Sequence, residues 1–310
     1  MNGIKKTATV FLSTYNGEKY LKEQIDSILT QSEVFVHIII RDDGSKDNTV
    51  NIIKEYEKKH GNIRGIFGEN IGCGYSFLKM IYEEEYEDTD LYAFSDQDDI
   101  WDDDKLISAS KLMDNSKKCF YYSAQNIVDE NSKFIRYENC FERVSRYNIY
   151  SASMIGLSRG CTQVWNNAFH KTIVERKPNL KNILIHDTWL HYNSFFDCKQ
   201  IYDPMPHMSY RQTRDNLIGA DIGMGLIKNI RRKYNKFKYH NERLARIREK
   251  SAVEYEKFFS ENYDSKLLMT AHYRENLFNR IYLMFSSKYN QGVSMNWRIY
   301  NTWAIIRGKL

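Results

Sequence analysis

The chain has 310 residues, of which 42% are hydrophobic and 27% are charged, with only 3 prolines and 15 glycines. This composition allows one or two domains with a sizeable core, and it excludes a globally disordered, collagen-like or low-complexity protein. The net charge of +5 is uneven: ten Lys or Arg and two Glu lie between Lys228 and Lys250, whereas the rest of the chain has 35 basic and 38 acidic residues, which argues against a nucleic-acid-binding protein.

The five cysteines are odd in number and widely spaced, and no Cys-x-x-Cys occurs. This pattern predicts neither a disulfide framework nor a zinc site, and it fits a reducing compartment. The N-terminus lacks the apolar core of a signal peptide, and no apolar run is long enough to cross a bilayer. We therefore expect a cytoplasmic protein, with peripheral attachment to the inner face of the cell membrane as an option.

The first half of the chain alternates between short apolar runs and helical periodicity. Strands are predicted over residues 8–13, 34–40, 63–67, 91–94 and 119–124. Helices are predicted over residues 18–29 and 104–114, from residue 47 or 48 to about 59, and around 77–82. Such alternation predicts an α/β fold with a mostly parallel sheet that carries helices on both faces.

Polar side chains follow four of these strands directly. They are Thr14, Tyr15 and Asn16, then Asp42 and Asp43, then Asn70 to Gly72, then Asp96 to Asp99. In parallel sheets the ligand binds beyond the carboxyl ends of the strands. The sequence therefore predicts one site at this edge of the sheet.

The motifs at this edge favour a metal-assisted diphosphate site. No Gly-x-Gly-x-x-Gly follows the first strand and no Walker A motif occurs, which disfavours a dinucleotide or P-loop site. Carboxylates repel a diphosphate but can hold a divalent cation that binds one. We assign this role to Asp96 and Asp98. The alternative, an acidic turn that caps the next helix, is preferred for residues 102–104.

Five segments together resemble the inverting family 2 glycosyltransferases of GT-A fold, in order and spacing. The similarity is greatest to the bacterial rhamnosyltransferase-like branch that builds capsule, O-antigen and cell-wall polysaccharides. It covers about residues 7–220 and rests on Ser-Thr-Tyr-Asn-Gly (13–17), Arg-Asp-Asp-Gly-Ser (41–45), Asn-Ile-Gly (70–72), Ser-Asp-Gln-Asp-Asp-Ile-Trp (95–101) and His-Asp-Thr-Trp (186–189).

The resemblance implies roles at the donor site. Asp43 matches the residue that accepts the N–H of a uracil or thymine base, and its substitution is expected to spare the fold because its turn is taken to be exposed. Asp42 is expected to shape that turn. Asp96 and Asp98 match the Asp-x-Asp motif that holds Mn²⁺ or Mg²⁺, with Asp98 in direct contact, and Gln97 would face the ribose or the donor sugar. The other nucleotide-contacting positions are Thr14, Tyr15, Asn16, Asn70 and Gly72.

Asp187 matches the catalytic base, which removes the proton of the acceptor hydroxyl as that oxygen attacks the anomeric carbon. The alternative is a helix-terminal Asp stabilised by the helix dipole. Trp189 either stacks on a sugar or belongs to the core, and His186 is expected to orient or pack.

One position departs from the family pattern. Relatives usually carry Tyr-Arg-Gln-His, whereas this chain has Thr213 at the place of the His. Metal binding through this segment is thus in doubt. Arg211 and Arg214 are offered as ligands for phosphate oxygens.

The C-terminal part is basic and aromatic. Apolar residues recur at three- and four-residue steps between 227 and 250, which predicts a basic amphipathic helix, and more helix is predicted over 267–310. The basic helix could pack on the catalytic domain, attach to an anionic inner-membrane surface or bind nucleic acid, the last being the least favoured. We expect a catalytic domain over 1–222 and a helical region over 223–310.

The combined expectation is a metal-dependent inverting glycosyltransferase. The leading donor is dTDP-L-rhamnose, followed by a UDP-hexose, and the acceptor is a glycan or lipid-linked sugar of a bacterial surface polysaccharide. Two alternatives stay open: a sugar-1-phosphate nucleotidyltransferase, and an inactive membrane-associated scaffold. The first lacks the expected Gly-rich basic loop after the first strand, and the second is disfavoured by the intact Asp98 and Asp187.

Overall fold

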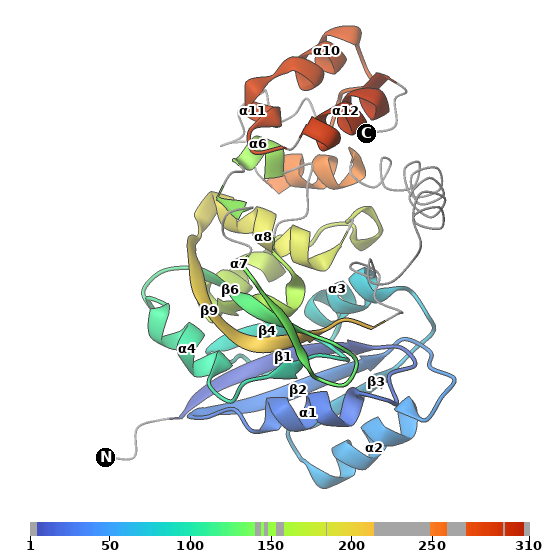
Figure 1. Ribbon diagram of the computed structural model, residues 1–310, viewed down its shortest axis with the longest axis vertical. Helices are drawn as coiled ribbons and strands as arrows, with labels where there is room; N and C mark the ends of the chain where they lie inside the picture. The colour runs from blue at the N-terminus through green and yellow to red at the C-terminus, as the bar shows by residue number, and fades with distance from the viewer. Residues whose placement is uncertain are drawn as a thin grey trace. The chain divides into compact units, whose positions relative to one another are not determined.

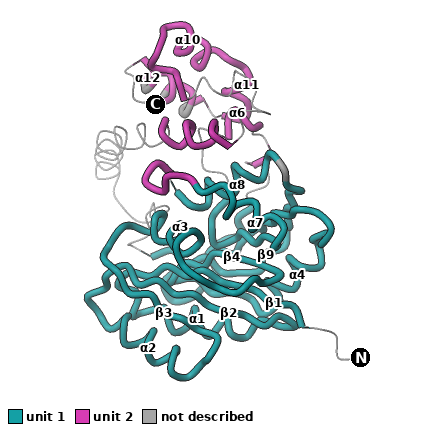
Figure 2. The backbone as a smooth tube through the Cα atoms, turned by 180° about the vertical axis from the view of Figure 1, so that it is seen from behind, with its two compact units in different colours: residues 1–141, 158–177, 185–213 teal, residues 142–157, 178–184, 214–310 magenta. Residues whose placement is uncertain are grey.

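The computed structural model describes residues 5–139, 144–145, 148–152, 158–183, 185–213, 249–258, 271–293 and 295–306. The chain forms two compact units, shown in separate colours in Figure 2. Unit 1 comprises residues 1–141, 158–177 and 185–213, and unit 2 comprises 142–157, 178–184 and 214–310. The predicted domain boundary at residue 222 falls outside the described residues.

A single mixed sheet forms the centre of unit 1 (Figure 1). Its strands lie in the order β3-β2-β1-β4-β8-β6-β9-β5, and β7 pairs with β6. Pairing is parallel from β3 to β4 and between β6 and β9, and antiparallel in the other pairs. The strands are β1 Lys6–Thr14, β2 Val34–Asp42, β3 Ile63–Phe67, β4 Leu91–Asp96, β5 Ile100–Trp101, β6 Cys119–Val128, β7 Phe134–Glu138, β8 Gln163–Asn166 and β9 Lys199–Arg211.

Helices cover both faces of this sheet, as predicted. Helices α1 and α2 lie on one side of β1 to β3, and α3 and α8 lie on the other side (Figure 1). The helices of unit 1 are α1 Leu21–Leu29, α2 Thr49–Lys59, α3 Cys73–Glu83, α4 Lys105–Leu112, α7 Asn167–Glu175 and α8 His186–Asp197, with a short 3-10 turn, η1, at Gly160–Thr162.

The two faces of the sheet bury different side chains. Alternate residues of β1 and β2, such as Val10 and Ile38, pack with α1, α2 and α4 in an aliphatic core. The opposite face is aromatic, where Phe11, Phe94 and Trp165 lie together. This division follows from the period-two alternation of side chains along a strand.

The strand register brings the predicted polar clusters to the same level. Ser13 of β1 pairs with Asp96 of β4, and Thr14 pairs with Asp42 of β2. The loops that follow these three strands therefore begin side by side. The sequence prediction of one site at this edge depends on this register.

Unit 2 is helical in its described residues. It contains α6 Ile149–Ala152, a 3-10 turn η2 at Leu180–Asn182, a helix over 249–258, α10 Leu277–Phe285, α11 Ser287–Asn290 and α12 Met295–Ile306. Tyr273, Leu283, Tyr289 and Ile305 form a small core. The basic helix predicted over 227–250 lies outside the described residues, except for its last two positions. Among the described helices, none has the length and apolarity needed to cross a membrane.

Candidate active site

The loop after β1 is fastened to the loop after β4 by Gln97. The Gln97 side-chain oxygen accepts hydrogen bonds from the Thr14 hydroxyl at 2.6 Å and from the Tyr15 backbone N–H at 2.8 Å. Its amide nitrogen donates to the Tyr15 carbonyl at 3.3 Å. Gln97 was expected to face the ribose or donor sugar. In this structure its amide fixes the loop after β1, where Tyr15 remains exposed.

Asn16 joins the same loop to the turn after β2. It adopts a left-handed conformation with φ of 50°. Its backbone N–H donates to the Ser45 hydroxyl, and its side-chain oxygen accepts from the Lys46 N–H, both at 2.8 Å. Three strand-end loops are thereby held together through the β1 loop.

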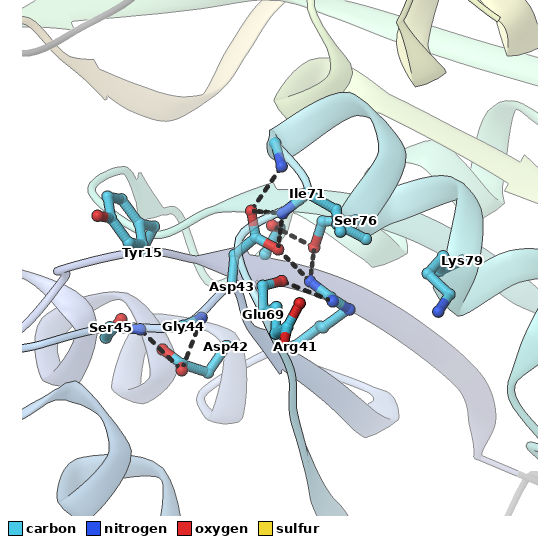
Figure 3. A network of polar contacts seen from close by, with 12 residues as sticks. Tyr15, Arg41, Asp42, Asp43, Gly44, Ser45, Glu69, Ile71, Ser76 and Lys79 are labelled. Carbon is cyan, nitrogen blue, oxygen red and sulfur yellow. Dashed lines mark hydrogen bonds and ion pairs between the residues drawn. The ribbon is translucent and has the colours of Figure 1, made fainter. Parts of the chain in front are cut away.

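The two aspartates at the end of β2 have separate roles (Figure 3). One Asp42 oxygen accepts the backbone N–H groups of Gly44 and Ser45, at 3.1 and 3.0 Å, so this residue shapes the turn as expected. Asp43 points the other way. Its carboxylate pairs with Arg41 and accepts the backbone N–H groups of Ile71 and Gly72.

Asp43 is therefore not on an exposed turn. Its side chain is only 3% exposed and that of Arg41 only 5%. The expectation that Asp43 can be replaced without harm to the fold is therefore wrong, because it assumed an exposed turn. Its bonds to residues 71 and 72 fix the loop that begins α3, where Gly72 has a φ of 87° and Asn70 is exposed. The base-reading role of Asp43 stays a prediction.

An acidic cluster follows β4. One ligand atom from each of Asp96, Asp99 and Cys161 lies within 4.8 Å of the others, a group that could hold a metal ion. The second Asp99 oxygen is buried and has no hydrogen-bond partner among the described residues. Burial raises the pKa of Asp96, and burial together with the Asp96 charge raises that of Asp98 to about 7.

This donor set suits a hard divalent cation. Burial raises the pKa of the Cys161 thiol well above its ordinary range, and burial with the charges of Asp96 and Asp98 does the same for the Asp99 carboxyl. Hard divalent cations prefer oxygen ligands, so the carboxylates are the better ligands of the three. Asp99 joins Asp96 here, whereas the sequence motif predicts Asp96 and Asp98 as the metal ligands. Asp99 directly follows Asp98 in the sequence, and this adjacency is the signal that could have identified it as a ligand.

Two basic residues missed by the sequence analysis lie near this cluster. Lys105 is fully buried, donates to the Cys161 carbonyl at 2.5 Å and stands 3.7 Å from the Trp101 ring centre. Arg159 pairs with Glu138 at 3.0 Å and lies over the Tyr210 ring. The charges of both residues lower the pKa of Asp96 against the stronger effect of burial. No local motif marks either residue.

Asp187 lies in the first turn of α8, as predicted. Its carboxylate accepts the Thr188 N–H at 2.5 Å and the Thr188 hydroxyl at 3.2 Å. Burial raises its pKa to about 6, and the negative charge of Asp96 contributes to this rise. A carboxyl with this pKa is largely ionised at neutral pH and is more basic than an exposed one, which suits a general base.

Tight packing positions the start of α8. His186 is 4% exposed and its ring centre lies 4.0 Å from that of Phe77 and 4.6 Å from that of Phe94. A Cβ on Gly160 would stand 2.6 Å from the His186 ring nitrogen and 3.4 Å from the Asp187 Cβ. Only a glycine fits here without displacement, and His186 has the packing role that was expected for it.

Cys73 shows how closely the predicted carboxylates converge. This residue begins α3, and burial raises the pKa of its thiol well above the ordinary value. The charges of four aspartates raise it further: Asp96, Asp187, Asp43 and Asp98. Geometry agrees for two of these carboxylates: Asp43 accepts the N–H of Gly72 directly before α3, and His186 beside Asp187 packs on Phe77 of α3.

Two predicted site residues lie elsewhere. Trp189 is 0% exposed and donates its indole N–H to the Tyr82 hydroxyl at 2.9 Å. A wholly enclosed ring offers no face to a sugar, so the core alternative holds in this structure and the stacking role is corrected.

Arg211 is also buried, at 2% exposure. Its guanidinium donates to the Asp98 carbonyl, the Glu130 carbonyl, the Ser132 hydroxyl and the Glu23 carboxylate. These bonds engage the guanidinium within the protein. The expected phosphate-binding role is therefore corrected: Arg211 holds the Asp98 loop in place. Thr213 ends the described segment, and Arg214 lies outside the described residues.

Comparisons with known sequences find related proteins. Residues 9–189 match the sequence model of glycosyl transferase family 2. The chain is 32% identical over 251 residues to dTDP-rhamnosyl transferase RfbG of Shigella flexneri, covering 70% of this chain and 79% of RfbG. It is 29% identical over 129 residues to TuaG of Bacillus subtilis, a putative teichuronic acid biosynthesis glycosyltransferase, covering 41% of this chain and half of TuaG.

Solved structures show the same fold. The 1–349 fragment of S. aureus TarS in complex with UDP-GlcNAc superposes with a TM-score of 0.58 at 16% identity, covering 98% of this chain and 82% of that one. The mannosyltransferase PcManGT of Pyrobaculum calidifontis, in complex with GDP-Man and Mn²⁺, gives 0.55 at 12% identity, covering 98% and 75%. The predicted GT-A fold is confirmed.

Proposed function

This chain belongs to glycosyl transferase family 2, and we propose that it is a metal-dependent inverting enzyme that transfers L-rhamnose from dTDP-L-rhamnose, or else a hexose from a UDP-sugar. The similarity to RfbG supports the rhamnosyl donor. The observation that carries the proposal is the acidic cluster of Asp96 and Asp99 beside Cys161, next to the start of α8, where Asp187 lies against Gly160. A diphosphate site and a general base are the two elements that sugar transfer needs.

The donor site is assigned to the strand-end loops. Thr14, Tyr15 and Asn16 would contact the nucleotide, with Asn70 and Gly72 on the facing loop. Gln97 and Asp43 hold these two loops in place. A pyrimidine imide N–H would approach the remaining acceptor capacity of Asp43.

Asp96, Asp98 and Asp99 would hold a divalent cation, Mn²⁺ or Mg²⁺. For Asp96 and Asp99 the fit rests on the oxygen-rich donor set and on the partnerless Asp99 oxygen, and Asp98 is included because it belongs to the same motif. When bound, the cation would neutralise charge on the departing diphosphate. The complex of PcManGT with Mn²⁺ is consistent with a cation in this fold.

Asp187 would carry the proton. The acceptor hydroxyl oxygen forms a bond to the anomeric carbon while its proton passes to the Asp187 carboxylate. The bond from the anomeric carbon to the phosphate oxygen breaks, and the diphosphate leaves with the electron pair. Attack from the face opposite the leaving group inverts the configuration at the anomeric carbon.

For the acceptor we propose a glycan or lipid-linked sugar of a bacterial surface polysaccharide, in keeping with the description of TuaG. The free cysteines among the described residues support a reducing, cytoplasmic location. We also propose that the basic segment over 227–250 attaches to the inner membrane surface, where a lipid-linked acceptor would lie.

A product analysis with dTDP-rhamnose and UDP-hexoses in the presence of Mn²⁺ tests this function. We expect slow release of the nucleoside diphosphate with water as the acceptor, and loss of release in Asp98→Ala. Release of a nucleoside triphosphate and sugar 1-phosphate that requires added pyrophosphate would instead indicate a nucleotidyltransferase. No turnover and no metal-dependent donor binding would indicate an inactive scaffold.

A further inference from the structure

Helices α10 and α12 of unit 2 each expose an apolar face. The exposed residues are between 36% and 79% accessible. They are Leu277, Phe278, Ile281 and Phe285 on α10, and Met295, Ile299, Trp303 and Ile306 on α12. We call these eight residues the α10/α12 apolar faces. Eight large apolar side chains exposed on one small unit exceed the scattered apolar residues of an ordinary protein surface.

The spacing of these residues puts each set on one side of its helix. At about 100° per residue, either set spans an arc of no more than about 100°. Leu283 lies on the opposite side of α10, and Ile305 lies about 120° around α12 from the centre of its exposed set; both are buried in the core of unit 2. The exposed faces are thus separate from the surfaces that hold the unit together.

The segment that carries these faces is basic, and the acidic Glu275 directly before it contacts His272. From Asn276 to Leu310 the sequence contains five Lys or Arg and no Asp or Glu. Arg280 and Arg298 donate to backbone carbonyl groups, and neither forms an ion pair within the described part of the chain. The apolar side chains and the basic charge together match a partner that has an anionic surface and an apolar interior.

The positive charge excludes several of the partners that could cover these faces. The segment over 228–250 carries ten basic and two acidic residues, so it would be repelled by these faces, as would a second copy of them. A nucleic acid offers little contact for Leu, Ile and Met side chains. Helices of 9 and 12 residues are too short to cross a bilayer, which takes about 20, but they can lie in its interface.

We propose that the α10/α12 apolar faces dock on an anionic lipid bilayer, with their side chains at the boundary between headgroups and acyl chains. The proposal rests on the proposed function for its purpose, because it would place the enzyme next to a lipid-linked acceptor. Its test needs no donor sugar, so it can fail while the transferase assignment stands.

The test is flotation of the full chain with vesicles of phosphatidylcholine alone or mixed with phosphatidylglycerol. We expect binding to the mixed vesicles only, because each basic residue near an anionic surface raises the partition coefficient about fivefold. Added salt should weaken this binding. Phe278→Ser combined with Phe285→Ser should lower the partition coefficient by at least about tenfold. Both rings are exposed, so the fold should be kept, and circular dichroism checks this.

The matched control is Phe134→Ser combined with Ile135→Ser, which removes two exposed apolar side chains from β7 of unit 1 and should leave binding unchanged. Equal binding to neutral vesicles, no binding to either, or unchanged binding of the Phe278/Phe285 variant would overturn the proposal. So would a dimer in lipid-free buffer that this variant abolishes, because a second copy would then be the occupant.

Discussion

Asp187 combines a raised pKa with a position at the start of α8, and its titration should govern the reaction. Since its pKa is about 6, kcat should rise with pH through about 6 and then level off. Asp187→Asn should keep donor binding and lose about 10²- to 10⁴-fold in kcat, because the amide cannot take a proton. Steady-state kinetics over pH 5 to 8 measure both. Full transfer by the Asn protein would reject the mechanism.

The same residue has a predictable effect on stability. Folding raises the pKa of Asp187 from 3.8 to about 6, so the folded state binds this proton more tightly than the unfolded state. The carboxyl therefore stabilises most at pH below 3.8, and this contribution is lost as the pH rises to about 6. Asp187→Asn should be no less stable than the wild type at pH 8. A clear loss of melting temperature there would instead support a helix-capping role.

The Arg41–Asp43 pair yields a second prediction at this scale. Asp43→Ala should lower the free energy of unfolding by about 3–5 kcal/mol, because it leaves the Arg41 charge buried without its partner and frees the N–H groups of residues 71 and 72. Urea denaturation measures this change. Arg41→Met combined with Asp43→Ala should lose less than the sum of the single variants, whereas additive losses would show that the pair is not coupled.

Sequence patterns located these residues but not their burial. Asp42 and Asp43 are adjacent and identical, yet one caps a turn and the other is enclosed by Arg41 and the loop before α3. Arg211 pairs with Glu23 across a sequence separation of 188 residues. Partners so distant cannot be read from a local motif, which is why the phosphate role of Arg211 and the sugar role of Trp189 were assigned wrongly.

At the scale of the elements, the contact between η1 and α8 is sensitive to a small change. Gly160→Ala would place a methyl group against the His186 ring, which Phe77 and Phe94 hold from other sides. We expect a loss of about 1–3 kcal/mol in stability and a lower kcat, because the start of α8 must shift. Gly61→Ala is the control, since its Cβ would meet nothing within 4 Å. Equal melting temperatures and kcat for the two variants would contradict the packing argument.

The elements themselves were predictable where the apolar pattern was strong. The continuous apolar runs of β1, β2 and β4 predicted parallel strands at their correct places. The antiparallel β8 between β4 and β6 was not foreseen, because four residues are too few to show a period. Strand β9 was missed because it contains two prolines and many polar residues, a composition that disfavours strand.

At the scale of the whole molecule, binding of the donor should stabilise the fold by mass action. UDP or dTDP with Mn²⁺, at about one hundred times its dissociation constant, should add about 2.7 kcal/mol. For a domain of about 150–250 residues this corresponds to a rise in melting temperature of about 5–10 °C. CDP should give a smaller rise, because cytosine lacks the imide N–H that Asp43 is proposed to accept.

Metal removal separates the two parts of the donor site. EDTA should abolish the portion of the thermal shift that depends on the diphosphate, and Asp98→Ala should reproduce this loss even with Mn²⁺ present, because the carboxylates after β4 can hold the diphosphate only through a cation. Differential scanning fluorimetry with UDP, dTDP, CDP and GDP, each with and without Mn²⁺, measures both effects. A response to GDP alone would contradict the pyrimidine assignment, and a shift that survives EDTA unchanged would contradict the metal site.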